Sequence, residues 1–341
     1  MKKIFKHITP TVWIREDEEF YQIVKEFYEQ GIENIRVNCT RHKPIEYIKA
    51  IAEFRKWCDV NLKFQFNIML DLPIPNKKIR VFYDWEGKEM EIERNEKCIL
   101  TRSNKYCDRE KVLYTENSTI FQKTEIGEII YTGEKGPEFQ IIEKKDDTLK
   151  LNCLKPGIIS YGKYITTDNL KYERCNSQEI ESFLKMCSIV QPEKVAFSFI
   201  NHEEDMSILL SDRNWICDAD TIAKIETMTA VENLNNIALK CQEIMIGRGD
   251  LLINAGIQNF AISVNRIMEY CNLHNIKYYV ATGILQYLDT ELKKISRAEL
   301  LDLYNILKFK DANVILGYGI CKDIKHTRET LDLLKKLGQG M

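Results

Sequence analysis

One segment, residues 221–250, reads TIAKIETMTAVENLNNIALKCQEIMIGRGD and decides the fold. It contains two short apolar runs rich in β-branched residues, at Thr221–Ile225 and Glu243–Gly247. Between them, Val231–Lys240 has the apolar spacing of a helix. A strand, a helix and a second strand in this order predict a parallel pair joined by a crossover helix. The segment therefore predicts one unit of an α/β fold.

The same alternation covers most of the chain. Six further strands are predicted from apolar runs at Lys3–Thr9, Asn34–Asn38, Phe64–Asp71, Lys194–Phe199, Lys277–Ala281 and Asn313–Leu316. Helical spacing is found at Glu18–Gln30, Pro44–Lys56, Gln178–Met186, Glu203–Leu210, Gln258–Asn272, Arg297–Lys308 and Lys325–Lys336. Eight strands that each lead to a helix predict a (β/α)₈ TIM barrel.

The alternation stops after the third strand. From Val81 to Asp168 the helical spacing disappears, and short alternating segments separated by turn residues replace it. We therefore predict a barrel formed by residues 1–80 and 169–341 with an inserted small all-β, β-barrel-like domain at 81–168. An insertion at the active-site end of a barrel is well placed to act as a lid that excludes water.

The composition is that of an ordinary globular protein. A hydrophobic content of 44% argues against intrinsic disorder, and a net charge of −2 predicts no general affinity for nucleic acid or anionic membranes. No run approaches the ~18 apolar residues of a membrane span. Met1–Pro10 lacks the apolar core of a signal peptide, so we expect a cytoplasmic protein. The 11 cysteines and five histidines show no zinc-ligand spacing, which favours reduced thiols and disfavours a zinc enzyme.

Polar residues stand where the predicted strands end. Because enzymes of this fold build their active sites at the C-terminal ends of the strands, these residues are the candidates for chemistry. They are Thr9 and Pro10, Arg36 with Asn38 and Thr40, Asp71, Ser198, Lys224 with Glu226, Asp250, and Thr282.

Two of these carboxylates, Glu226 and Asp250, are hard oxygen ligands that would suit Mg²⁺ or Mn²⁺ together with water and substrate oxygens. Lys224 lies two residues before Glu226 on one strand and would face the same side, where it could neutralise charge on a transferred group. Arg36 could hold a phosphate or a carboxylate through two hydrogen bonds.

Structural interpretations of the same residues stay open. Arg36 could pair with Asp71 in a salt bridge inside the barrel mouth. Asn38 and Thr40 could cap the helix that follows them.

In combination, these segments resemble the pyruvate kinase family. The similarity rests, in order along the chain, on Arg36–Thr40, Met69–Asp71, Val195–Ile200, Ile222–Glu226, Ile246–Asp250 and Ala281–Thr282. The resemblance implies that Glu226 and Asp250 hold the divalent metal and that Lys224 and Arg36 contact the phosphoryl group. It also places Thr282 near the face where the enolate exchanges a proton.

The resemblance implies further contacts. Pro10 and Arg80 would touch the nucleotide, at its adenine end and its phosphates respectively. A K⁺ ion would be bound by Asn38, Thr40 and Asp71. The substrate site would be lined by Ser198, Gly249, Asp250 and Thr282.

The sequence also departs from the family pattern. Asp71–Asn76 reads DLPIPN where the family has Asp-Thr-Lys-Gly-Pro-Glu, which removes a lysine and a glutamate near the nucleotide and the monovalent ion. Lys77 or Lys78 could supply the missing charge and make K⁺ dispensable. Leu316–Gly319 reads LGYG where the family has Ser-Gly-Glu. The printed sequence stops after the predicted barrel, so we expect no counterpart of the family's C-terminal regulatory domain within it.

The leading hypothesis is a metal-dependent phosphotransferase of pyruvate kinase type. It would move a phosphoryl group between phosphoenolpyruvate, or a related enol or oxo acid, and an adenine nucleotide, and a specialised substrate stays open. The first alternative is a metal-dependent lyase or aldolase acting on a pyruvate-type enolate without a nucleotide. The second is a catalytically degenerate barrel that serves as a binding protein. Under the leading hypothesis the partners are small molecules, with no nucleic acid or membrane, and homo-oligomerisation is left open.

Overall fold

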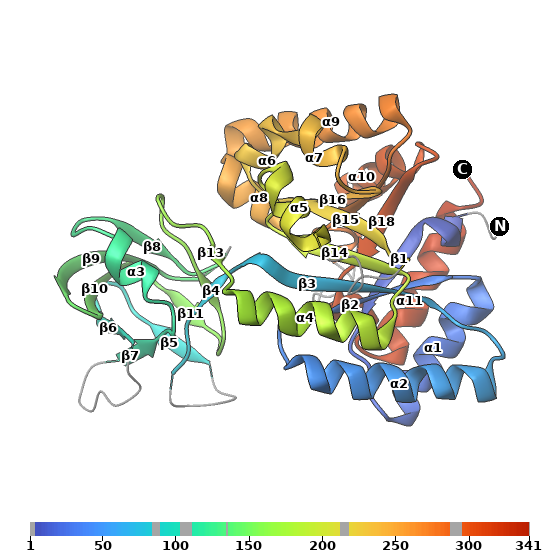
Figure 1. Ribbon diagram of the computed structural model, residues 1–341, viewed down its shortest axis with the longest axis horizontal. Helices are drawn as coiled ribbons and strands as arrows, with labels where there is room; N and C mark the ends of the chain where they lie inside the picture. Colours follow the sequence, from blue (N-terminus) through green and yellow to red (C-terminus); the bar gives the residue numbers. More distant parts are fainter. Residues whose placement is uncertain are drawn as a thin grey trace. The chain divides into compact units, whose positions relative to one another are not determined.

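The computed structural model describes residues 4–83, 89–102, 111–133, 136–211, 218–286 and 295–340. The chain forms two compact units, one of Met1–Pro75 with Asn176–Met341 and one of Asn76–Cys175 (Figure 1). Lys3, the first residue of the first predicted strand, lies outside the described residues.

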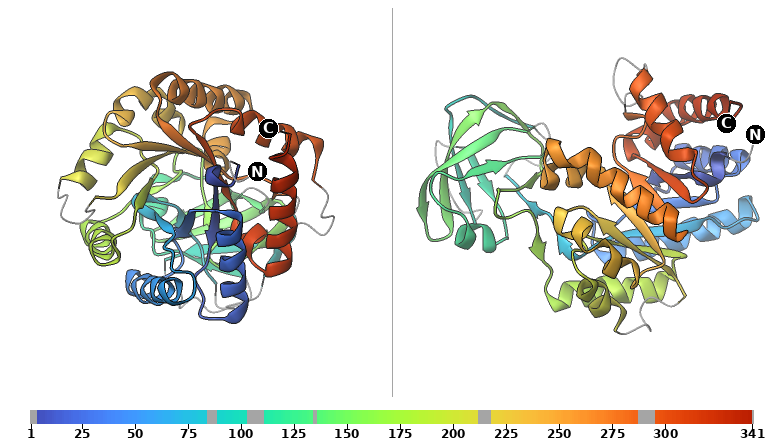
Figure 2. Two further views of the ribbon diagram at one scale, coloured as in Figure 1. Left: turned by 90° about the vertical axis from the view of Figure 1, so that its right-hand side faces the viewer. Right: turned by 90° about the horizontal axis from the view of Figure 1, so that it is seen from above.

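Eight parallel strands form a closed barrel in the first unit. Each strand pairs with the next barrel strand along the chain, and β1 pairs with both β2 and β18, so the sheet closes on itself. Helices surround these strands (Figure 2, left). The strands are β1 (Ile8–Val12), β2 (Asn34–Asn38), β3 (Asn67–Lys77), β14 (Lys194–Ser198), β15 (Asp220–Ile225), β16 (Glu243–Gly247), β17 (Lys277–Ala281) and β18 (Ala312–Leu316). The predicted (β/α)₈ barrel is confirmed.

An apolar layer fills the interior of the barrel. It consists of the buried residues Met69, Ala196, Ile222, Met245, Tyr279, Ala281 and Ile315. Alternate residues of a strand face the same side. The residues two positions further along β3, β14, β15 and β16 therefore also face inward, nearer the C-terminal ends, and these are Asp71, Ser198, Lys224 and Gly247. The period of the strands thus places a polar layer directly above the apolar one.

The helices begin and end at local signals. In α1 (Glu18–Gln30), the side chain of Asp17 accepts a hydrogen bond from the Phe20 amide at the start, and Gly31 ends the helix with φ of 80°. The other helices of this unit are α2 (Pro44–Asn61), α4 (Ser177–Val190), α5 (Glu203–Leu210), α6 (Met228–Glu232), α7 (Leu234–Ala238), α8 (Arg248–Ala255), α9 (Ile257–His274), α10 (Arg297–Leu307) and α11 (Ile324–Leu337).

Two local predictions were wrong. The strand expected at Lys3–Thr9 begins as a 3₁₀ helix, Ile4–His7, and β1 starts only at Ile8. Ile4 and its neighbour Phe5 are both buried, as are all five residues of β1, so their apolar character fits a buried strand and a buried helical turn alike. The single helix expected at Val231–Lys240 is instead the two short helices α6 and α7, which meet at Asn233.

The second unit consists mainly of short strands around its own apolar core. Five of them form one sheet in the order β7-β6-β10-β9-β8. The unit extends a few residues beyond 81–168 at both ends because the end of β3 pairs antiparallel with β13. Its described elements are β4 (Ile79–Arg80), β5 (Met90–Ile92), β6 (Lys97–Thr101), β7 (Lys111–Tyr114), α3 (Thr119–Lys123), β8 (Ile129–Tyr131), β9 (Glu138–Lys145), β10 (Thr148–Lys155), β11 (Gly157–Ile159), β12 (Tyr164–Ile165) and β13 (Glu173–Arg174).

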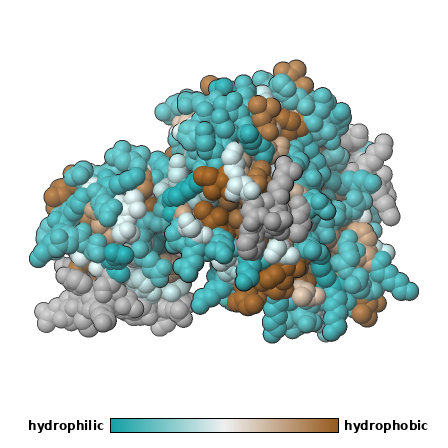
Figure 3. All heavy atoms as spheres, viewed as in Figure 1, coloured by the Kyte–Doolittle hydropathy of each residue, from teal (hydrophilic) through white to brown (hydrophobic). Residues whose placement is uncertain are grey.

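Hydrophilic side chains dominate the surface of both units on the face in Figure 3. Among the helices of the described residues, none combines the length and the apolar character needed to cross a bilayer.

Candidate active site

A buried ionic cluster lies in the polar layer above the barrel core. Asp71, at its centre, is only 1% exposed. Arg36 donates from Nε and Nη2 to Asp71 Oδ2 over 2.9 and 2.6 Å. From the other side, Lys224 Nζ donates to Asp71 Oδ1 over 3.1 Å. One carboxylate thus holds two cations next to each other. The salt bridge between Arg36 and Asp71 is the one that the structural interpretation proposed, whereas the contact with Lys224 was not predicted.

The ammonium group of Lys224 is fully coordinated. It has three N–H donors, and its Nζ lies 3.1 Å from Asp71 Oδ1, 3.1 Å from Ser198 Oγ and 3.2 Å from Glu226 Oε1. Ser198 is itself fixed, because its hydroxyl donates to the backbone oxygen of Leu72 over 2.8 Å. The position of the Lys224 charge is therefore set by three strands of the barrel.

Opposite charges keep the cluster ionised. Burial lowers the pKa of Lys224, but Asp71 and Glu226 raise it by more, so the net pKa lies above its ordinary value. Burial likewise raises the pKa of Asp71, and the charges of Lys224 and Arg36 outweigh it, so this pKa is lowered. Asp250 also raises the pKa of Lys224, which places its carboxylate within electrostatic range of the cluster. Lys224 and Asp71 are both charged at neutral pH.

Glu226 is held in place by its neighbours. Its Oε2 accepts a hydrogen bond from the Phe199 amide over 2.9 Å, where the Phe199 backbone has φ of 49°. Gly247, on the adjacent strand β16, leaves the space that Glu226 occupies. A Cβ at Gly247 would lie 2.6 Å from Glu226 Cγ and 2.7 Å from Glu226 Oε1.

The donor set fits a divalent cation of the magnesium type. Asp250 lies in the first turn of α8, which begins directly after Gly247, and Glu226 packs against that glycine. No group of three or more histidine, cysteine or acidic side chains suited to a metal occurs among the described residues. Mg²⁺ is commonly held by only one or two carboxylates, with its other ligands from water and substrate phosphates. Glu226 and Asp250 therefore suit an ion that is completed by its substrate.

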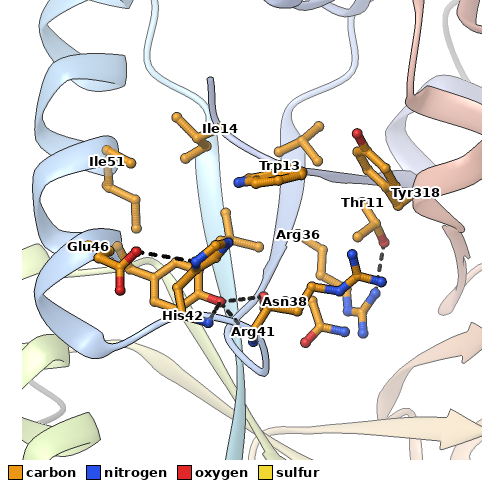
Figure 4. A pocket seen from close by; sticks show the side chains of 14 residues that line it. Thr11, Trp13, Ile14, Arg36, Asn38, Arg41, His42, Glu46, Ile51 and Tyr318 are labelled. Atoms are coloured by element: carbon orange, nitrogen blue, oxygen red, sulfur yellow. Dashed lines mark hydrogen bonds and ion pairs between the residues drawn. The ribbon is translucent and has the colours of Figure 1, made fainter. Parts of the chain in front are cut away.

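Two cavities share Arg36. The larger, of about 420 Å³, is lined by four aromatic side chains, those of Trp13, His42, Tyr47 and Tyr318, and we call it the aromatic pocket (Figure 4). The Trp13 ring is 5.5 Å from the His42 ring and 6.4 Å from the Tyr318 ring, measured between centroids. Trp13 is 46% exposed, so a ligand can reach its ring.

The second cavity has a volume of about 210 Å³, and we call it the Thr282 pocket. Arg36 lines it together with Thr282, Gly283 and Gly317. Arg36 uses three of its five N–H groups on Asp71 and Thr11. Two N–H groups of Arg36 therefore have no partner among the described residues, and Arg36 lines both cavities.

The other predicted site residues are placed as follows. Asn38 Oδ1 accepts from the Thr40 amide over 3.2 Å, which is a local turn rather than a cap of α2. Pro10 is buried inside β1 and lines neither cavity. Gly249 lies in the first turn of α8. Arg80 belongs to the second unit, where its Nη1 donates to the Gly162 backbone oxygen over 2.7 Å.

The aromatic pocket was not predicted from the sequence. Trp13 and His42 follow the ends of β1 and β2, and Tyr47 lies in α2. Tyr318 follows β18, which is far from β1 in the sequence but pairs with it in the closed barrel. Extending the search a few residues beyond each strand end, with β18 placed next to β1, would have found Trp13, His42 and Tyr318.

Comparison with known proteins identifies the family. The model described as "Pyruvate kinase, barrel domain" matches residues 3–318 of this chain. The chain belongs to the pyruvate kinase family. Among curated relatives, the pyruvate kinase of Thermotoga maritima is 24% identical over 94% of this chain and 67% of its own length. That of Kluyveromyces lactis is 28% identical over 86% of this chain and 59% of its own length.

The chain is thus shorter than these relatives and spans between 59 and 67% of their length. The crystal structure of Cryptosporidium parvum pyruvate kinase superposes with a TM-score of 0.83 at 17% identity, covering 97% of this chain and 69% of that one. The pyruvate kinase barrel fold is therefore common to both.

Proposed function

We propose that the chain transfers a phosphoryl group between phosphoenolpyruvate and ADP. The observation that supports this most directly is the pair of cavities that share Arg36. Flat aromatic walls in the aromatic pocket suit a nucleobase, whereas the Thr282 pocket has the size for a small acid. The transferred group lies between them, against the two N–H groups of Arg36 that Asp71 and Thr11 leave available.

The charged residues stabilise the transferring group through position. Phosphoryl transfer depends mainly on alignment and on neutralising charge spread over the phosphoryl oxygens. Lys224 supplies a fixed positive charge beside Arg36, because both are bound to Asp71. Thr282 lies at the face where the enolate exchanges its proton. Glu226 and Asp250 hold Mg²⁺ or Mn²⁺, which when bound neutralises negative charge on substrate oxygens.

A monovalent ion does not fit the residues assigned to it. The Asn38 amide oxygen accepts the Thr40 amide, and the single negative charge of Asp71 is already shared by two cations, Arg36 and Lys224, which would repel a third. We therefore propose that K⁺ is not required for activity. The mainly β unit Asn76–Cys175 begins with the last two residues of β3, and we assign it the role of a lid that excludes water.

Phosphorus NMR of the protein with phosphoenolpyruvate, ADP and Mg²⁺ tests this proposal. We expect ATP to appear at similar rates with K⁺ and with Na⁺ as the only monovalent cation. If ATP forms only with K⁺, the proposed phosphoryl transfer stands, and the proposal that K⁺ is not required is wrong. Absence of ATP under both conditions would reject the proposal. Metal-dependent cleavage of a 2-oxo acid without nucleotide would then favour the lyase.

Trp13→Ala is expected to raise the KM for ADP about tenfold and to change the KM for phosphoenolpyruvate little. Base stacking on an aromatic side chain is worth about 1–3 kcal/mol, and Trp13 is an accessible wall of the aromatic pocket. Steady-state kinetics measures both constants. Trp57→Ala is the control, because Trp57 stacks on Tyr21 at 4.3 Å and lines neither cavity. Equal KM values for ADP in both variants would remove the nucleobase from this pocket.

A further inference from the structure

The guanidinium group of Arg248 joins two neighbouring strand ends. Arg248 follows β16 and Thr282 follows β17, and the residues before them, Gly247 and Ala281, are partners in the sheet. Arg248 donates from Nε and Nη2 to the Thr282 backbone oxygen over 2.9 and 2.7 Å. Its Nη1 donates to both carboxylate oxygens of Asp302, over 3.0 and 2.8 Å. All three nitrogens of Arg248 are therefore engaged.

The backbone that Arg248 holds is strained. Thr282 has φ of 73°, a region that β-branched residues rarely adopt, and Gly283 follows with φ of 75°. Such conformations persist only where the surrounding structure over-determines them, and they concentrate at active sites. A Cβ at Gly283 would lie 3.4 Å from Arg248 Nη2, so the guanidinium packs closely against this turn.

Arg248 also lies in the same helical turn as Asp250. It is the first residue of α8, and its side chain is 13% exposed. A displacement of the first turn of α8, which carries Asp250, would therefore also pull the guanidinium group away from the Thr282 carbonyl. Asp302, on α10, lines neither cavity and binds the guanidinium group through Nη1, the nitrogen that does not contact Thr282.

We propose that Arg248 is a positioning residue that fixes Thr282 and Asp250 relative to each other, with Asp302 as its anchor. This inference rests on the proposed function, because its purpose is the alignment of the substrate in the Thr282 pocket with the metal carboxylate. Lysine cannot replace Arg248, since a single ammonium group does not reproduce the planar fork that binds one carbonyl and one carboxylate together.

Steady-state kinetics of Arg248→Lys, Asp302→Asn and Asp302→Glu tests the proposal. A misplacement of about 1 Å can cost about 10²-fold in rate. We expect Arg248→Lys to lower kcat about 10- to 100-fold and Asp302→Asn to lower it less, with the KM for ADP within about twofold of the unmodified protein. Asp302→Glu restores the carboxylate and should recover most of the lost rate. A merely structural role would not separate kcat from KM in this way.

Arg328→Lys serves as the control. Arg328 forms an ion pair with Glu26 on the barrel surface, and its side chain is 61% exposed. Unchanged kcat in both Arg248→Lys and Asp302→Asn would overturn the positioning role and leave the proposed function standing. An equal loss of kcat in Arg328→Lys would also overturn it.

The failure of the proposed function would be distinguishable. If the unmodified protein forms no ATP, hydrogen exchange of residues 282–286 replaces the kinetic readout. Faster exchange in Arg248→Lys and Asp302→Asn, but not in Arg328→Lys, would support the clamp on Thr282. Unchanged exchange in all variants would overturn it.

Discussion

Lys224→Met should lower turnover of phosphoenolpyruvate and ADP by at least ~10²-fold, the scale for removal of one preorganised charge stabiliser. Methionine has a similar length and no charge, so the variant deletes the cation from the polar layer. Asp71 and Glu226 would lose the ammonium that lies 3.1 and 3.2 Å from them. The negative charge left behind would oppose the approach of a phosphoryl group. A coupled assay of ATP formation, with circular dichroism to check folding, measures the effect.

Lys277→Met is the matched control for this prediction. Lys277 begins β17 at the opposite end of the barrel strand from Thr282, lies 3.5 Å from Glu243, and its side chain is 41% exposed. The same chemical change there should leave turnover nearly unaltered. If the folded Lys224→Met variant has the turnover of the unmodified protein, Lys224 does not take part in the reaction. A loss of the same size in Lys277→Met would show that the assay reports general destabilisation.

Gly247→Ala is expected to lower turnover about 10²-fold, although the substitution adds one methyl group. The added Cβ would lie 2.6 Å from Glu226 Cγ, so the Glu226 side chain must move. Gly247 has φ of −84°, where alanine is not strained, and crowding is therefore the cause of the effect. Displacement of a metal-binding carboxylate should also raise the Mg²⁺ concentration needed for half-maximal activity by about tenfold. Mutation of residues that orient metal ligands typically lowers metal affinity by about 10- to 100-fold.

Another crowded glycine, away from the site, provides the control. A Cβ at Gly338, after α11, would lie 2.9 Å from Ile4 Cγ2. Gly338→Ala should lower the melting temperature while turnover and Mg²⁺ dependence stay close to the unmodified values. A Gly247→Ala variant with normal Mg²⁺ dependence would contradict the claim that Glu226 binds the metal in a position set by Gly247.

Much of the fold could be predicted from local patterns. The bounds of α1, β2, α5, β16 and β17 agree with their predicted ranges, because apolar period, helix caps and turn residues act over a few positions. The start of the chain could not be predicted in this way. Ile4 and Phe5 are apolar and fit a buried strand or a buried helical turn equally well, so the local sequence does not select the 3₁₀ helix.

The candidate site could be predicted in part. The positions of Asp71 and Lys224 at the C-terminal ends of predicted strands made them candidates, and the family resemblance gave them roles. Neither source indicated that Asp71 would hold both Arg36 and Lys224, or that Gly247 would make room for Glu226. These contacts depend on the register between strands, which local sequence does not specify.

The sequence by itself determined the number and order of the barrel strands, the place of the insertion, and the residue types at the strand ends. Only the tertiary structure decided which side chains meet at and beyond those ends. Closure of the barrel pairs β1 with β18 and thereby brings Trp13 to within 6.4 Å of Tyr318, although they are separated by nearly the whole chain. The physical reason is that strand period acts locally, whereas cavities and ion pairs arise where distant segments pack together.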